Sequence, residues 1–217
     1  MELNIPYVKQ PTGSAWCGPA TATMVLKFYG KKTSLKRVVR ELHIKSSQGL
    51  NNAHLASYFL NYGMDVTIQA WPSGMTDKLL SRESLSGDTA INTLRNAQKK
   101  VKSKARILCR ELVALTKRGG NIIFHPITLE DLRSRLEDGS AIIMCIDAKH
   151  FMDISRKTGH YVVISGIADD GLQLSQPYVY VHDSIRGPSK FIPAKSILDA
   201  CNDWFGSVIY VKPKAVR

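Results

Sequence analysis

The chain has 217 residues, 44% of them hydrophobic, which is enough for one globular domain (residues 1–217) with its own core. Thirty Lys and Arg residues against 18 Asp and Glu residues give a formal net charge of +12, compatible with an acidic peptide, nucleic acid or an anionic membrane surface as partner. The sequence contains no apolar stretch long enough to span a membrane and no signal peptide, and its four cysteines are scattered, so we expect a cytoplasmic protein.

The first predicted element is a helix that begins near Cys17. Gly18 and Pro19 suit the entry and first turn of a helix, because proline there loses no hydrogen-bond donor that the helix needs. Good helix formers follow over 20–29, and Gly30 is placed to end the helix in a left-handed conformation. A thiol attacks a carbonyl as thiolate, and a helix N-terminus beside an imidazole lowers its pKa. Cys17 is therefore a candidate nucleophile.

Two residues upstream of Cys17 are candidates for the same site. Gln10 stands seven residues before the cysteine. Acyl transfer needs a hydrogen-bond donor directed at the developing oxyanion, and a side-chain amide can supply it together with the backbone N–H of the nucleophile. We interpret Gln10 as this donor and Trp16, the neighbour of Cys17, as a substrate-binding residue.

A basic segment occupies the middle of the chain. We predict a helix over roughly 87–118 with a partial apolar face, ended by Gly119 and Gly120. Between 95 and 118, Glu111 is the single acid against nine basic residues: Arg95, Lys99, Lys100, Lys102, Lys104, Arg106, Arg110, Lys117 and Arg118. The segment is either a solvated surface or a docking face for an acidic partner. It has no interleaved aromatic residues, so no nucleic-acid motif supports binding to bases.

The C-terminal half predicts a helix and an antiparallel sheet. Thr128 is placed to cap a helix over 129–136. Runs rich in apolar and β-branched residues predict strands over 141–147, 160–167, 178–183 and 206–212. A hairpin turn is expected at Asp169-Asp170-Gly171. The fold class that these elements predict is α+β, with N-terminal helices packed on the sheet.

Two residues of the predicted sheet complete a possible catalytic set. His160 opens the second of these strands and is the candidate base, with His150 as the second candidate. Asp183 ends the third strand and is the candidate acid that orients the histidine, with Asp169 or Asp170 as competitors. Gly159, which precedes His160, is a candidate substrate-binding residue.

The remaining cysteines favour structural roles. Cys109, Cys145 and Cys201 are interpreted as small buried hydrophobic residues. No Cys-x-x-Cys or His-x₃₋₅-His pair gives a zinc signature, and no glycine-rich phosphate loop occurs. We therefore expect neither a metal nor a cofactor.

Four residues, in this order and local sequence, carry a resemblance to a known family: Gln10, Cys17, His160 and Asp183. They resemble the papain superfamily of cysteine peptidases, and most closely its bacteriocin-processing (double-glycine) branch. The resemblance covers residues 1–70 and 125–212, and within it 50–66 resembles that branch's second helix and following strand. It implies a papain-like fold in which a helical N-terminal lobe packs on a C-terminal antiparallel sheet, with a basic helical insertion at about 72–122.

The resemblance also implies a function. Cys17 would attack an amide carbonyl, His160 would shuttle the proton, Asp183 would orient His160, and Gln10 would stabilise the oxyanion. This indicates a cysteine peptidase or related amide hydrolase that cleaves a specific peptide or protein. Deamidation or transglutaminase-like acyl transfer on the same triad remains open, as does a non-catalytic binding module that uses the basic face. We expect no inhibitory propeptide. Peptidases of that branch usually form the first domain of a membrane exporter, and this exporter role does not carry over to this sequence.

Overall fold

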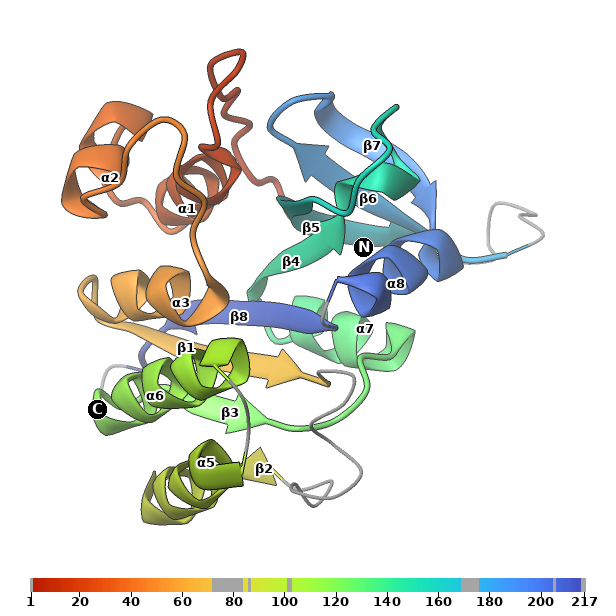
Figure 1. The fold of residues 1–217 in the computed structure, drawn as a ribbon. Coiled ribbons are helices and arrows are strands. Elements are labelled where there is room, and N and C mark those ends of the chain that lie inside the picture. The colour runs from red at the N-terminus through yellow and green to blue at the C-terminus, as the bar shows by residue number, and fades with distance from the viewer. Residues whose placement is uncertain are drawn as a thin grey trace.

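The computed structural model describes residues 2–71, 84–85, 87–100, 103–168, 176–204 and 206–215. Within them, eight strands form one sheet that has helices on both faces (Figure 1). The strands are β1 (Met64–Ala70), β2 (Ser84–Leu85), β3 (Asn121–Ile123), β4 (Ala141–Asp147), β5 (Gly159–Ala168), β6 (Tyr178–Asp183), β7 (Gly187–Pro193) and β8 (Ser207–Pro213). The helices are α1 (Cys17–Phe28), α2 (Leu35–Glu41), α3 (Asn52–Leu60), α5 (Gly87–Lys100), α6 (Ser103–Lys117), α7 (Leu129–Glu137), α8 (Ala194–Asp203) and the short 3-10 helix η1 (Ala148–His150).

The predicted helices at the two sides of the sheet are confirmed. Gly30 follows α1 with a φ of +72°, the left-handed conformation expected of a residue that ends a helix. Thr128 caps α7, and the Asp131 side chain accepts a hydrogen bond from the Thr128 backbone in return, which completes a capping box. Local sequence therefore determines where these helices start and stop.

The four predicted strands are confirmed with bounds that agree within one residue. The sheet has the order β2-β3-β1-β8-β4-β5-β6-β7, and β8, β4, β5 and β6 are antiparallel neighbours within it. The sheet also extends beyond them. β1, the strand expected to follow the helix within 50–66, pairs antiparallel with β8, and β3, which was not predicted, pairs parallel with β1. The α+β class is confirmed, and the N-terminal half contributes a strand as well as helices.

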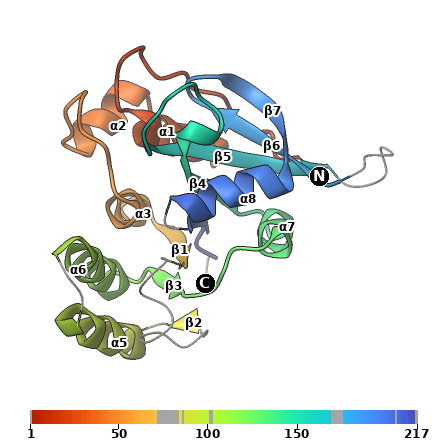
Figure 2. The same ribbon diagram turned by 45° about the vertical axis from the view of Figure 1, so that its right-hand side comes forward.

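Helices lie on the two sides of the sheet (Figure 2), and each face of the sheet has its own apolar core. Ile143 and Cys145 of β4 lie in the core that includes α1 and α3, whereas Met144 and Ile146 lie in the core that includes α7 and α8. Successive side chains of a strand point to opposite faces. Because helices cover both faces, every residue of β4 is buried. One face therefore meets the cysteine-bearing helix, and the opposite face meets α8.

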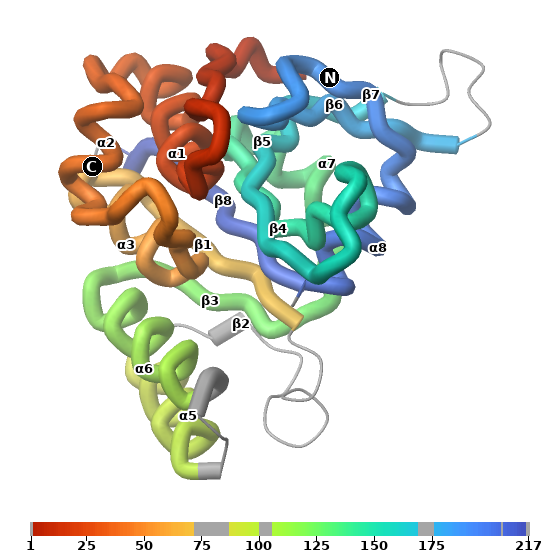
Figure 3. Tube along the Cα trace, turned by 45° about the horizontal axis from the view of Figure 1, so that its top comes forward, coloured from red at the N-terminus to blue at the C-terminus, as the bar shows by residue number. Residues whose placement is uncertain are grey.

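The predicted single helix over 87–118 is wrong. The chain forms two helices here, α5 and α6, which pack against each other (Figure 3). The helices bury Ala90, Leu94 and Ala97 from α5 and Cys109, Leu112 and Leu115 from α6. Each helix has its own apolar stripe, so two packed helices remove from water surface that one straight helix would expose. Gly119 follows the end of α6 as predicted and has a φ of +90°.

Two further expectations concern the turn after β5 and membrane-spanning segments. The turn predicted at Asp169-Asp170-Gly171 lies outside the described residues. In the part of the chain that the structure describes, no helix is both long enough and apolar enough to cross a bilayer.

Candidate active site

The site begins with Cys17, the first residue of α1, which packs across β5. Gly18 permits this close approach, because a Cβ atom at Gly18 would lie 3.1 Å from the Leu50 side chain and 3.4 Å from the Tyr161 ring. The first backbone N–H groups of a helix have no partner within it and form the positive end of the helix dipole. The half-buried thiol of Cys17 lies at this end.

His160 and Asp183 form a buried pair on the sheet. Nε2 of His160 lies 2.9 Å from Oδ1 of Asp183, and both residues are at most 3% exposed. The same Oδ1 accepts the backbone N–H groups of Ile185 at 2.8 Å and Arg186 at 3.2 Å. Burial opposes ionisation of Asp183, but these three donors together hold the pKa of the carboxyl below its usual value. The carboxylate therefore fixes the imidazole and leaves Nδ1 for another partner.

Cys17 and His160 alter each other's ionisation. Burial opposes ionisation of the thiol, but hydrogen bonding and charge attraction from His160, with backbone hydrogen bonds from Tyr161 and Gly18, lower the pKa of Cys17. Burial likewise opposes protonation of His160, yet its hydrogen bonds with Asp183 and Cys17 raise the pKa of the imidazole to about 9. The two shifts favour a thiolate–imidazolium pair at neutral pH.

The other three cysteines behave in the opposite way. Burial raises the pKa of Cys109, raises that of Cys201 to about 12 and raises that of Cys145 well above its usual value. All three are buried, as the sequence predicts. A buried thiol without a cationic partner stays protonated and unreactive. Cys17 is the one cysteine of the four whose pKa falls.

Gln10 is held next to the strand end that carries Asp183. Its Oε1 accepts the hydroxyl of Ser184 at 2.7 Å, and its backbone N–H donates to the Ser184 carbonyl at 3.0 Å. Nε2 of Gln10 donates to the Ser14 carbonyl at 2.7 Å. A carboxamide nitrogen has two hydrogens, so one remains for a further acceptor. The role of this hydrogen at an oxyanion stays a prediction.

Trp16 and Gly159, the predicted substrate-binding residues, lie beside Cys17 and His160. Trp16 is half-buried against the α1 core, and its Nε1–H has no hydrogen-bond partner among the described residues. A Cβ atom at Gly159 would lie 2.5 Å from the indole ring of Trp204. Glycine is required here because the Trp204 ring occupies the place of a side chain. Substrate contact by either residue stays a prediction.

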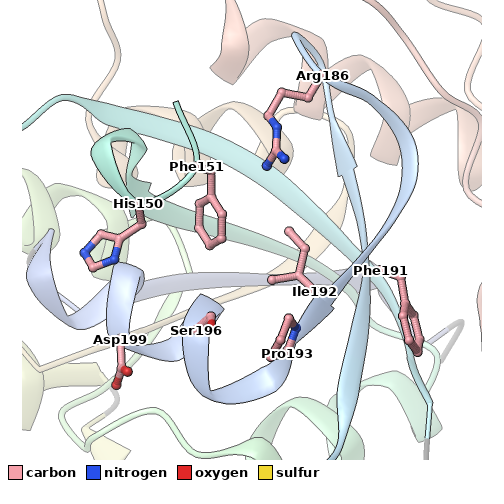
Figure 4. Close-up of a pocket in the computed structure, with 8 residues that line it drawn as sticks. All are labelled: His150, Phe151, Arg186, Phe191, Ile192, Pro193, Ser196 and Asp199. Carbon is pink, nitrogen blue, oxygen red and sulfur yellow. The ribbon is translucent and has the colours of Figure 1, made fainter. Parts of the chain in front are cut away.

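The second candidate base, His150, has different partners. Its Nε2 lies 2.8 Å from Oδ2 of Asp203. Figure 4 shows His150 beside α8, where it helps to line a pocket of about 350 Å³ with Phe151, Ser196 and Asp199. The structure therefore pairs His160, and not His150, with an acid at the strand end. Of the predicted acids, Asp183 occupies this place, whereas Asp169 and Asp170 lie outside the described residues.

Sequence reasoning missed three residues that surround this site. Ser184 positions Gln10, Trp204 covers Gly159, and Asp147 is a fully buried carboxylate opposite Gly159 in the sheet. The position of Ser184 directly after Asp183 was an available signal. Trp204 and Asp147 gave none, because their proximity to His160 depends on long-range packing.

A helix-borne cysteine opposite a sheet-borne histidine, in an α+β fold of this topology, is the arrangement of the papain-like cysteine peptidases. A family model described as the Peptidase_C39 like family matches residues 2–196. The chain belongs to this family, as the double-glycine resemblance predicts, and membership supports a cysteine peptidase function. No curated protein matches the chain.

The chain is also similar to solved structures, and the first of those named here supports this assignment of the fold. A double glycine motif protease from an AMS/PCAT transporter, crystallised in complex with the leader peptide, has a TM-score of 0.51 at 16% identity, covering 98% of this chain and 94% of that one. The peptidase domain of Streptococcus ComA, a bifunctional ABC transporter, has a TM-score of 0.48 at 15% identity, with 95% and 97% covered. A putative C39-like peptidase from Bacillus anthracis has a TM-score of 0.45 at 13% identity, with 98% and 96% covered.

Proposed function

We propose that the protein is a cysteine peptidase that cleaves a peptide or protein substrate through Cys17, His160 and Asp183, with Gln10 as oxyanion donor. The observation that carries the proposal is the meeting of a thiol of lowered pKa with an imidazole held 2.9 Å from a buried carboxylate. Family membership supports the same chemistry. The four free cysteines also support a reducing, cytoplasmic location.

The reaction follows from the ionisation states. The Cys17 thiolate attacks the scissile carbonyl carbon, and the oxyanion that forms accepts hydrogen bonds from Gln10 and the Cys17 backbone N–H. Imidazolium His160 then gives its proton to the leaving amine, which leaves a thioester. Neutral His160 next takes a proton from water, whose oxygen attacks the thioester and releases the carboxylic acid and the Cys17 thiolate. Proton donation to the amine is lost as pH rises through about 9, the pKa of His160.

Selective alkylation tests the proposed nucleophile. At pH 6 an ordinary thiol of pKa near 8.5 is only about 0.3% thiolate, whereas Cys17 carries a lowered pKa. Iodoacetamide at pH 6 should therefore modify Cys17 of the folded protein and leave Cys109, Cys145 and Cys201 intact, as mass spectrometry of tryptic peptides would show. Modification of Cys109 or Cys201 as fast as Cys17 would refute the assignment.

We also propose that the basic face of α5 and α6 recruits an acidic segment of the substrate. Among the side chains of this helical pair whose burial the structure describes, five basic ones are exposed: Arg95, Lys99, Arg106, Arg110 and Lys117. None of them forms an ion pair within the described ranges. The pair lies at the β3 side of the sheet, away from β5 and β6 (Figure 2). Its expected contribution is therefore to association, through screened long-range attraction, and not to the chemical step.

Charge reversal tests this recruitment. Changing Arg95, Lys99, Arg106 and Arg110 together to Glu should lower kcat/KM for a cleaved peptide that bears an acidic tail, and should weaken its salt dependence. The variant should cleave the same peptide with Asn and Gln in its tail at the wild-type rate. A matched control reverses four exposed basic residues of the N-terminal helical region, Lys31, Lys32, Lys36 and Arg40. Two outcomes would contradict a specific docking face. One is an equal loss of kcat/KM in the two variants, and the other is cleavage of the acidic peptide by the charge-reversed variant at the wild-type rate at low ionic strength.

A further inference from the structure

Asp147 is a carboxylate buried next to the proposed catalytic histidine. It is 0% exposed and lies at the end of β4. In the pairing of β4 with β5, Asp147 lies opposite Gly159, and the adjacent pair is Ile146 with His160. Removing a carboxylate from water is costly unless other groups compensate its charge and lone pairs. The groups that compensate the charge and lone pairs of Asp147 therefore indicate which part of the chain the residue holds in place.

One oxygen of Asp147 closes the base of the connection between β4 and β5. Oδ1 accepts the backbone N–H groups of Lys149 and Thr158, each at 3.2 Å. Beside it, the Ala148 N–H donates to the Thr158 carbonyl at 2.8 Å. Two of these hydrogen bonds, from the Thr158 N–H and the Ala148 N–H, thus tie the two ends of residues 148–158 together, directly before Gly159 and His160. The carboxylate bridges a residue that enters this connection and a residue that leaves it.

The other oxygen of Asp147 faces a cation that joins the connection to α8. Nζ of Lys149 lies 3.6 Å from Asp147 Oδ2 and 3.4 Å from Asp203 Oδ2. Asp203 also contacts Nε2 of His150, and its carbonyl accepts Nζ of Lys157 at 3.1 Å. The last residue of α8 therefore holds three side chains of the connection.

The residue after Asp203 links this network to the site. The indole ring of Trp204 stands where a Cβ atom of Gly159 would be, at 2.5 Å. A shift of the connection away from α8 would move Gly159 from under Trp204. Because Gly159 precedes His160, the same shift would change the direction in which the imidazole leaves the strand.

We propose that Asp147 is a positioning residue: it fixes the β4–β5 connection on α8 so that His160 meets Asp183 with Nε2 and Cys17 with Nδ1. Asp147 acts through the backbone at Thr158 and Gly159 and touches neither the thiol nor the substrate. The inference rests on the proposed function of the Cys17–His160 pair, and it adds a residue that the four-residue constellation does not contain.

The test compares the two ends of β4. Asp147→Asn keeps its carbonyl oxygen as acceptor for the two backbone N–H groups but turns amide hydrogens toward Lys149. Asp138→Asn is the matched control, because Asp138 accepts the Ser140 N–H at 3.1 Å and lies 3.0 Å from Lys212 Nζ at the opposite end of the same strand. Asp138 caps the C-terminus of α7 just before β4, and a strand of this length puts its two ends about 20 Å apart. Only one of them lies beside His160.

The readout is the rate of Cys17 alkylation by iodoacetamide against pH, with thermal unfolding measured in parallel. We expect Asp147→Asn to raise the apparent pKa of Cys17 by about one unit, which lowers the alkylation rate at acidic pH about tenfold. Asp138→Asn should lose stability and keep the wild-type profile. Since the readout needs no substrate, a wild-type protein that itself shows an ordinary thiol profile would refute the proposed function, separately from the role of Asp147.

A second variant keeps the inference testable if Asp147→Asn does not fold. Asp203 is about half exposed, so Asp203→Asn should fold while loosening the contacts with Lys149 and His150. It should shift the Cys17 profile in the same direction by a smaller amount. A wild-type alkylation profile in Asp203→Asn, or in a folded Asp147→Asn whose unfolding temperature alone is lowered, would overturn the positioning role and leave Asp147 a structural acid.

Discussion

Replacing Cys17 with alanine should abolish cleavage of any peptide that the wild-type protein cleaves, because the proposed mechanism takes its attacking atom from Cys17. The three remaining thiols are buried and their pKa values are raised. The substitution removes one sulfur atom from a half-buried position and leaves the 2.9 Å His160–Asp183 contact in place. Stability should therefore change by no more than about 1 kcal/mol. Peptide cleavage and thermal unfolding measure the two effects.

A matched control removes a thiol elsewhere. Cys109 is completely buried in α6, far along the chain from the site. Cys109→Ala should lower the unfolding temperature through the cavity it leaves and keep cleavage near the wild-type rate. Cleavage by purified Cys17→Ala at more than trace level would show that another group is the nucleophile.

Replacing Gln10 with alanine should lower turnover by about 10²–10³, the usual loss when one oxyanion donor is removed. Alkylation of Cys17 should persist, because His160 and backbone hydrogen bonds from Tyr161 and Gly18 lower the pKa of the thiol. Gln10 is not one of the groups that lower it. The measurement compares kcat with the alkylation rate on the same protein. A parallel loss of both would indicate misfolding, and turnover near wild type would remove Gln10 from the mechanism.

Ser184→Ala separates the donor from its support. The Ser184 hydroxyl holds Oε1 of Gln10 at 2.7 Å, whereas the amide nitrogen is bound to the Ser14 carbonyl and has one hydrogen left. Losing the hydroxyl should loosen the amide without removing it. We expect Ser184→Ala to lower turnover clearly less than Gln10→Ala does. If Ser184→Ala were the more damaging change, the contact with Ser184, and not the free amide hydrogen, would be the important feature.

The parts of the fold that the sequence predicts are those with local signals. Pro19 and Gly30 mark the start and end of α1, and Thr128 marks the start of α7. The β-branched and apolar runs predict the bounds of β4, β5, β6 and β8 within one residue. Cys17, His160 and Asp183 could be chosen because each one stands at an end of such an element, where a side chain can reach across to another.

The parts that the sequence does not predict depend on packing between distant segments. The division of 87–118 into α5 and α6 follows from two apolar stripes that cover each other. The parallel pairing of β3 with β1 joins the C-terminal end of the insertion with the strand that precedes the insertion. Trp204 over Gly159 results from the way α8 ends beside the β4–β5 connection. Hydrophobic periodicity and secondary-structure propensity carry no information about such long-range contacts.

The measurement that tests the central claim most directly is mass spectrometry of a proteome-derived peptide library after incubation with wild-type protein, with Cys17→Ala as the blank. A peptidase forms an acyl intermediate on Cys17 that water resolves, so the account predicts new peptide termini in the wild-type sample and none in the blank. The newly cut peptides should share sequence features around the cleaved bond. Products that gain about 1 Da at glutamine without chain cleavage would show deamidation instead. A wild-type sample identical to the blank, from a protein whose Cys17 is alkylated no faster than a free thiol, would contradict the claim that this is an enzyme.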